Sequence, residues 1–360
     1  MNSVDAIEVQ NFRNHKHLRI EFEKGINVIW GENGSGKTAL LEAIYTLSMG
    51  RSFRTRLYKE TLKEGCDNLS IKGLFTNKDQ KQKIVLNQLL NGQRKFIIDE
   101  SNHVSVKELV GKNPIVILSP EEQIITKGYP ADRRSYIDKI FSIVSGEYLN
   151  TLLMYQRILK QRNTAIRNLR YGATRKEAVT AWDEPLISAG KKLWDIRIEL
   201  MEVFINQIHC ATKKYNSNNV DLVLIYKPEG SIETFEIRLE KALNSDLNKG
   251  WTTTGPHRDN YTFLFNTRSL REFGSQGEHK IALVLIKMAE ISMINIITGS
   301  NPVLMLDDLF AKLDFKRADE VLSLLSGRGQ TIITTTDIVD FKKHGLDLKS
   351  PHNSTYYLER

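Results

Sequence analysis

Cysteine is scarce in this 360-residue chain, which contains only Cys66 and Cys210. The two lie far apart and outside any C-x-x-C pattern, so the sequence predicts neither a zinc site nor a disulfide framework. A reducing cytoplasm is the expected location. The first residues also lack a basic segment followed by an apolar one, since Asp5, Glu8 and Arg13 interrupt them, and no signal peptide is expected.

Long uninterrupted apolar runs are missing as well. The most apolar segment, residues 281–298, carries Lys287 and Glu290 near its middle. We therefore expect a buried helix there rather than a membrane-spanning one. No repeat of fixed period and no low-complexity tract is present. With 41% apolar residues, the chain can fill one large domain with an inserted lobe, or two domains.

Residues 30–44, WGENGSGKTALLEAI, contain the phosphate-binding pattern G-x-x-x-x-G-K-[ST]. The strand-like run GINVIW precedes the pattern and a helical run follows it, which is the order that such a loop requires. We expect Lys37 to reach the β and γ phosphate oxygens of ATP and the Thr38 hydroxyl to hold Mg²⁺. The predicted nucleotide-binding residues of the loop are Gly31, Glu32, Asn33, Gly34, Ser35, Gly36, Lys37 and Thr38.

Two carboxylates end a second strand-like run, PVLMLDD. A buried strand that ends in a carboxylate can bring it beside a metal, so Asp307 is the predicted Mg²⁺ ligand, through water. Asp308, one residue further on, points in a different direction from Asp307 and is the candidate general base that orients the attacking water. A solvated acidic turn is the alternative interpretation of this segment.

A third element, FGSQGEHK, comes directly before the long apolar helix. Ser275 is placed to cap that helix, and the free amides of its first turn form a second anion-binding helix start. An ordinary helix cap is the alternative.

The three elements in this order resemble the ATP-binding-cassette (ABC) class of ATPases, with residues 275–278 as a divergent signature motif and residues 312–314 as the loop after the acidic strand.

Longer blocks are similar to the RecF family of SMC-like ATPases. They are residues 9–55, which include VQNFRNHK and GRSFRT, residues 118–138, LSPEEQIITKGYPADRRSYID, residues 254–260, TGPHRDN, and residues 274–290, GSQGEHKIALVLIKMAE. The resemblance implies an α/β fold in which an ABC-type P-loop ATPase head with a mixed sheet carries an inserted, mainly helical lobe. No long coiled coil is expected. We expect the head in residues 1–125 and 246–360 and the lobe in residues 126–245.

The same resemblance implies the activity. It implies weak, DNA-stimulated ATP hydrolysis with ATP and Mg²⁺ as cofactors, in a head-to-tail homodimer where Ser275, Gln276 and Gly277 of one copy contact the ATP held by the other. It further implies binding to duplex DNA and to single-strand gaps or junctions, and cooperation with RecO and RecR in loading RecA during replication, repair and the SOS response. A nucleotide-binding subunit of another ABC-type machine and a monomeric P-loop kinase are the alternatives.

Some positions depart from the ABC pattern or fit it weakly. Asp308 stands where many members have glutamate, which suggests slow turnover. The segment TIITTTD has no histidine at the switch position. Thr335 or Thr336 is the candidate replacement, and the alternative is that the γ phosphate is not sensed there. Gln123 is a candidate link between the metal and the lobe, with a solvated glutamine as the alternative. Arg13 and Asn14 are candidate ATP contacts, with a structural turn as the alternative.

Basic residues exceed acidic ones, 51 against 43, and the net charge of +8 favours polyanionic partners without identifying one. Residues 157–176 carry seven Lys or Arg and no acidic residue. A basic helix face suits sequence-independent phosphate contacts, although many such faces are only solvated. The candidate DNA contacts are Lys160, Arg167 and Arg170 here, and Arg54 and Arg56, together with Lys59 and Lys63, on an alternative surface.

Overall fold

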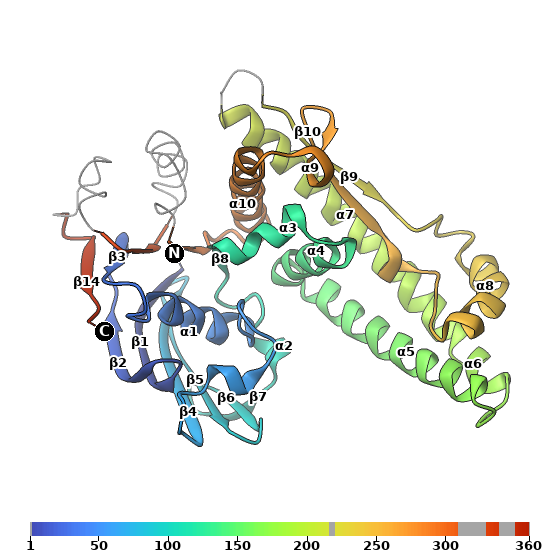
Figure 1. Ribbon diagram of the computed structural model, residues 1–360, viewed down its shortest axis with the longest axis horizontal. Coiled ribbons are helices and arrows are strands. Elements are labelled where there is room, and N and C mark those ends of the chain that lie inside the picture. Colours follow the sequence, from blue (N-terminus) through green and yellow to red (C-terminus); the bar gives the residue numbers. More distant parts are fainter. Residues whose placement is uncertain (1, 216–219, 309–328, 338–349, 360) are drawn as a thin grey trace. The chain divides into compact units, whose positions relative to one another are not determined.

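The computed structural model describes residues 2–215, 220–308, 329–337 and 350–359 (Figure 1). The expected loop at residues 312–314 lies outside them. The chain divides into two compact units: unit 1 is Met1–Gln123 with Leu283–Arg360, and unit 2 is Ile124–Ala282. The chain thus begins in unit 1, passes through unit 2 and returns to unit 1.

Unit 1 contains a five-stranded parallel sheet that carries the two motif-bearing strands. Its order is β14-β3-β13-β12-β8, with β3 (Ile26–Trp30), β8 (Ile115–Leu118), β12 (Val303–Leu306), β13 (Thr331–Thr335) and β14 (Ser354–Tyr357). β13 lies between β3 and β12 and pairs in parallel with both. Because parallel strands end at the same sheet edge, the segments that follow Trp30 and Leu306 emerge close together.

Unit 1 also contains a six-stranded antiparallel sheet. Its order is β2-β1-β4-β5-β6-β7, with β1 (Ser3–Phe12), β2 (His15–Glu21), β4 (Asn68–Asn77), β5 (Gln80–Leu89), β6 (Arg94–Ile98) and β7 (Ser101–Val104). The helix α1 (Lys37–Met49) contacts strands of both sheets, and Leu40, Leu41, Ile44 and Leu47 are fully buried. Shorter helical segments are η1 (Tyr58–Thr61), α2 (Val106–Leu109) and η2 (Pro120–Gln123).

Unit 2 is mainly helical. Its helices are α3 (Ile124–Lys127), α4 (Pro130–Val144), α5 (Gly146–Arg170), α6 (Glu177–Thr180), α7 (Asp183–Tyr215), α8 (Phe235–Lys249), η3 (Pro256–Arg258) and α9 (Leu270–Phe273). A three-stranded sheet joins β9 (Leu222–Lys227), β10 (Asn260–Phe265) and β11 (Arg268–Ser269). The helices α5 and α7 pack along each other (Figure 1), and at 25 and 33 residues they form no long coiled coil.

The end of the lobe differs from the expectation. Unit 2 extends to Ala282 instead of ending at residue 245. Strand β10 pairs with β9 over its whole length, and the guanidinium group of Arg197 on α7 binds the carboxylate of Asp259, 2.7 Å away. Both side chains are buried, so this ion pair ties residues 246–282 to the helices. A buried charge left without its partner is costly, which makes the pair an obligatory contact.

The apolar helix α10 (Gln276–Thr298) is long and apolar enough, by length and composition, to cross a membrane, but 67% of that window is buried inside the structure. Lys287 and Glu290, the two charges in its middle, bind each other at 2.9 Å and are both buried. Lys287 also binds Glu122. Burial of this helix agrees with the core helix that the sequence predicts.

Candidate functional site

The phosphate-binding loop, residues 31–36, connects the end of β3 to the start of α1. Gly36 has φ 94°, in the left-handed region that side-chain-bearing residues avoid. A Cβ atom at Gly36 would also lie 2.2 Å from Nε2 of His15. The position therefore accepts only glycine, and the loop turns tightly enough to leave the amides of the α1 N-terminus for an anion.

Lys37, the first residue of α1, is held by the loop itself. Its ammonium group donates hydrogen bonds to the carbonyl oxygens of Gly31, at 2.7 Å, and Glu32, at 2.8 Å. Burial lowers the pKa of Lys37, while the nearby carboxylates of Asp308 and Asp307 act to raise it. The ammonium group is therefore bound to the phosphate loop and interacts electrostatically with both carboxylates.

Thr38 and Asp307 meet at the sheet edge. The Thr38 hydroxyl donates to Oδ1 of Asp307 at 2.9 Å, and the hydroxyl of Thr334 on β13 donates to the same oxygen at 2.7 Å. Burial raises the pKa of Asp307, and these two hydrogen bonds act to lower it. One hydroxyl and one carboxylate are hard oxygen ligands of the kind that Mg²⁺ takes, together with phosphate and water oxygens.

The described residues contain no cluster of three or more His, Cys, Asp or Glu side chains able to hold a metal by themselves. The oxygen pair of Thr38 and Asp307 therefore fits a metal that arrives with a phosphate ligand better than a permanently bound one. Asp308 follows with φ 50°, and its N–H donates to the Thr334 hydroxyl at 3.0 Å.

A cavity of about 720 Å³ opens at these residues. Lys37, Thr38, Asp307, Asp308 and Thr334 line it together with Asn33, Gly34 and Gly36 of the loop. Its remaining charged lining includes Arg13, Arg54 and Lys63 as well as Glu60 and Glu64. Four cations and four carboxylates line the cavity, so its net charge identifies no ligand. The loop at the N-terminus of α1 favours a phosphate group, and the volume suits a nucleoside triphosphate.

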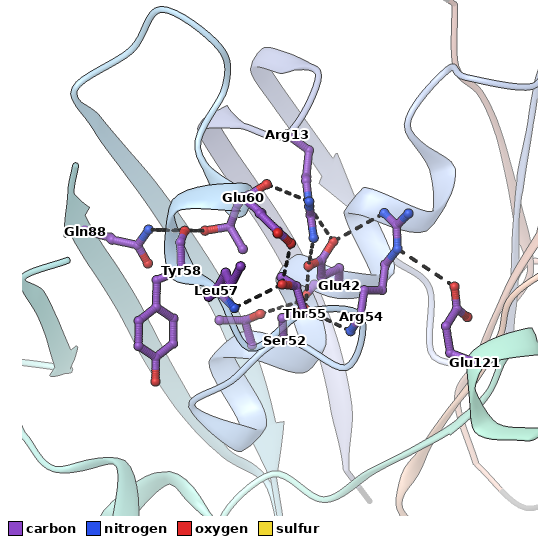
Figure 2. A network of polar contacts seen from close by, with 12 residues as sticks. Arg13, Glu42, Ser52, Arg54, Thr55, Leu57, Tyr58, Glu60, Gln88 and Glu121 are labelled. Atoms are coloured by element: carbon purple, nitrogen blue, oxygen red, sulfur yellow. Dashed lines mark hydrogen bonds and ion pairs between the residues drawn. The ribbon is translucent and has the colours of Figure 1, made fainter. Parts of the chain in front are cut away.

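Arg13 and Asn14, the predicted ATP contacts, also line this cavity, and both are already engaged. The guanidinium group of Arg13 binds the carboxylate of Glu42 through Nη2 and Nε, at 2.6 and 2.8 Å (Figure 2). Asn14 donates from Nδ2 to the carbonyl oxygen of Gly34 at 3.1 Å. These contacts favour the structural-turn alternative for Arg13, and the ATP contact stays a prediction.

Thr334 is the site residue that the sequence reasoning missed. Of the two candidates for the switch position, Thr335 donates its hydroxyl to the carbonyl oxygen of Asp337 at 3.1 Å, and Thr336 is exposed; the switch role of either stays a prediction. Thr334 lies fully buried beside Asp307. A polar residue within a buried strand next to the acidic strand was the available signal.

Gln123 ends η2 and is not among the residues that line the cavity. Its assignment as a metal link stays a prediction.

Ser275 caps α10 in unit 2. Its N–H donates to the carboxylate of Glu278 at 2.6 Å, and the N–H of Glu278 donates to the Ser275 hydroxyl at 3.3 Å, which is a capping box. Hydrogen bonds from the backbone and the side chain of Ser275 to the Glu278 carboxylate lower the pKa of Glu278. Ser275 and Gln276 are exposed and Gly277 is half-buried. The capped helix start is therefore presented to solvent in the described part of unit 2.

The candidate DNA contacts fall into two groups. Lys160, Arg167 and Arg170 are exposed on α5, whereas Arg162 in the same run is fully buried and binds Asp246 and Asp183, each at 2.7 Å. Arg56 is exposed. Arg54 lines the cavity and lies 3.5 Å from Glu42 and 4.0 Å from Glu121, so its position associates it with the nucleotide site.

Comparisons with known proteins agree with this geometry. The model of the RecF/RecN/SMC N terminal domain family matches residues 3–345. The DNA replication and repair protein RecF of Lachnoclostridium phytofermentans is 30% identical over 96% of this chain and 95% of its own length. RecF of Ruminiclostridium cellulolyticum is 33% identical over 98% and 96%.

Among solved structures, the recombination mediator protein RecF-ATP of the RecFOR pathway is 32% identical, with a TM-score of 0.87 over 93% of this chain and 92% of that one. An SMC head domain from Pyrococcus furiosus, 17% identical, aligns with a TM-score of 0.55 over 95% and 92%. It shows that the fold is shared with SMC heads, and the expected ABC-type α/β fold class is confirmed.

Proposed function

The chain belongs to the RecF family of SMC-like ATPases, and we propose that it is an ATP-dependent DNA-binding protein of recombinational repair. The contact between Thr38 and Asp307 carries this proposal, because it joins the phosphate loop to the acidic strand in a site suited to Mg²⁺ and ATP. RecF relatives that align with almost the whole chain and a RecF-ATP structure support it.

The residues of the cavity have distinct roles in this proposal. The loop amides and Lys37 bind the β and γ phosphates, and Thr38 and Asp307 hold Mg²⁺, which neutralises phosphate charge when bound. Asp308 orients the attacking water and accepts its proton. Since aspartate is one methylene shorter than the glutamate common in this class, hydrolysis is slow.

A second copy of the chain completes the site. Ser275, Gln276 and Gly277 begin a helix whose exposed N-terminus suits the γ phosphate of ATP held by the partner. ATP therefore closes a head-to-tail homodimer, and hydrolysis reopens it. The dimer binds duplex DNA near single-strand gaps, where it cooperates with RecO and RecR in loading RecA, and DNA stimulates its ATPase activity.

Retention on DNA tests this function. The wild-type chain is captured on immobilised gapped duplex in the presence of ATP and Mg²⁺, and release is followed after ATP is replaced by ADP. The proposal expects retention that depends on ATP and is lost with ADP. Equal retention without nucleotide, or none with ATP, would contradict it.

A further inference from the structure

Glu42 lies at the centre of a network of polar contacts beside the nucleotide cavity (Figure 2). It belongs to α1, the helix that begins with Lys37 and Thr38, and its side chain has no exposed surface. Its carboxylate accepts two hydrogen bonds from Arg13 and one of 2.5 Å from the Ser52 hydroxyl. A carboxylate buried in this way is stable only when its charge is compensated, so Glu42 holds Arg13 in one place.

Arg13 joins three segments that are distant in sequence. It lies in the turn between β1 and β2 with φ 53°. Arg13 makes two bonds to Glu42 on α1. Its Nη1 also donates to the carbonyl oxygen of Glu60 in η1 at 2.6 Å, and the backbone N–H of Arg13 donates to the carbonyl oxygen of Thr61 at 2.9 Å. The β1–β2 turn is thus fixed to both α1 and η1 through one side chain.

The two residues after Arg13 contact the phosphate-binding loop. Asn14 donates to the carbonyl oxygen of Gly34, and Nε2 of His15 lies 3.1 Å from the carbonyl oxygen of Gly36. A carbonyl oxygen accepts, so Nε2 of His15 carries the proton. Burial lowers the pKa of His15, which favours this neutral form at pH 7. The carbonyl groups of Gly34 and Gly36 are thus both bound by residues that follow Arg13, which fixes the conformation of the phosphate-binding loop.

We propose that Glu42 is a positioning residue of the nucleotide site: it pins Arg13, and through the β1–β2 turn it holds Asn14 and His15 against the phosphate-binding loop. The inference rests on the proposed function, since it assumes that the loop binds ATP. Glu42 itself touches no reacting atom. Its effect is to preorganise the loop before the nucleotide arrives, which reduces the entropic cost of binding.

The first test is Glu42→Gln in the full-length chain, measured by ATP titration and steady-state hydrolysis. The amide nitrogen of glutamine cannot accept from Arg13, so the two-bond contact is lost while size and shape are kept. We expect the dissociation constant and KM for ATP to rise about tenfold, equivalent to about 1.4 kcal/mol. The kcat at saturating ATP stays within about twofold, because the residues that act on the bound triphosphate are unchanged.

A double-mutant cycle tests the route. If Glu42 acts through the turn, Asn14→Ala and Glu42→Gln remove the same support, and the double variant binds ATP no more weakly than the worse single variant. If the two substitutions instead weaken ATP binding independently, so that their fold-changes multiply in the double variant, Glu42 does not act through Asn14 and the turn. Unchanged ATP binding in folded Glu42→Gln would overturn the proposal.

Glu290→Gln is the matched control. Glu290 is an equally buried carboxylate of unit 1, on α10, and it pairs with Lys287. We expect this variant to lower the melting temperature while the dissociation constant for ATP stays unchanged; an equal loss of ATP affinity would reduce Glu42 to a general role in folding and overturn the proposal.

A second variant decides the matter if Glu42→Gln does not fold. Arg13→Lys keeps the charge but not the two-point contact, and it should also weaken ATP binding about tenfold. Unaltered affinity in Arg13→Lys would overturn the proposal. Failure of the wild-type chain to bind ATP would instead overturn the proposed function itself.

Discussion

The hydroxyl of Thr38 donates a hydrogen bond of 2.9 Å to the carboxylate of Asp307, although 269 positions separate them in the sequence. The parallel sheet creates this contact, because β13 pairs with β3 on one side and β12 on the other. Both residues follow strands that end at the same edge. The second half of the site is therefore supplied by the chain segment that returns after unit 2.

Replacing Lys37 with alanine should abolish ATP binding at micromolar concentrations. The variant loses a charge-assisted contact to the β and γ phosphates, and we expect at least about 100-fold weaker binding, or about 2.7 kcal/mol. Isothermal titration with ATP and Mg²⁺ measures it, with the melting temperature as the control for folding. Binding within a few-fold of the wild type would remove Lys37 from the site.

Asp308→Asn should bind ATP but hydrolyse it at least about 100-fold more slowly. An amide keeps the shape of the side chain and cannot accept a proton from water, and loss of a general base costs roughly this factor. Phosphate release and dissociation from DNA are measured together, and the variant should stay on DNA longer when ATP is present. Normal turnover would exclude Asp308 as the base.

Alanine at Lys160, Arg167 and Arg170 should weaken DNA binding without affecting ATP binding. Affinity for DNA falls with salt concentration, and each phosphate contact contributes about −0.9 to the slope of log affinity against log salt. The slope of the triple variant should therefore be less steep than that of the wild type by about 2 to 3 units. The measurement is fluorescence anisotropy with duplex DNA at several salt concentrations.

A matched triple variant controls for net charge. Lys81 on β5, Lys95 on β6 and Lys78 in the turn between β4 and β5 are exposed in unit 1. Their replacement by alanine removes the same charge and should alter the slope by less than about one unit. Equal losses in both variants would mean that α5 makes no specific contact with DNA.

Stability should fall on acidification because His257 is buried. Burial lowers the pKa of His257 from 6.5 to about 4, and its ring is held between the hydroxyl of Tyr155, 2.6 Å away, and the carbonyl oxygen of Thr252, 3.0 Å away. Between pH 6.5 and about 4, His257 is protonated in the unfolded chain but neutral in the folded one. The stability that the neutral ring contributes is therefore fully present above pH 6.5 and is lost as pH falls towards 4. The free energy of unfolding should decrease by about 3 kcal/mol over this range.

Urea unfolding of the wild type and of His257→Gln at pH 4.5 to 7.5 isolates this group. The stability difference between the two proteins should shrink as pH decreases. A difference that does not change with pH would show that His257 does not titrate with unfolding.

The family and fold class were predictable because contiguous motifs encode them. The phosphate loop is one run of residues between a strand and a helix, and Asp307 follows a strand-like run that can be recognised by itself. By contrast, Glu42 looks like an ordinary polar residue of α1 in the sequence. Its role depends on Arg13, which reaches it only when the β1–β2 turn packs on the helix. Contacts between distant segments leave no local pattern.

The extent of the lobe was missed for the same reason. The lobe was expected to end at residue 245, but β9 and β10 pair across the intervening α8. Likewise, Arg162 belongs to a basic run yet lies four residues before Ile166, on the same buried face of α5. Its burial requires Asp246 from another helix, which the periodicity of α5 alone does not reveal.

The central claim is that ATP lies between two copies of this chain. Sedimentation velocity with and without ATP and Mg²⁺ tests it most directly, for the wild type and for Ser275→Arg. We predict that ATP converts the wild type from monomer to dimer, and that Ser275→Arg binds ATP with unchanged affinity but stays monomeric, because Ser275 belongs to the partner's site. A dimer of undiminished stability in Ser275→Arg, or a wild type that stays monomeric with ATP bound, would contradict the account.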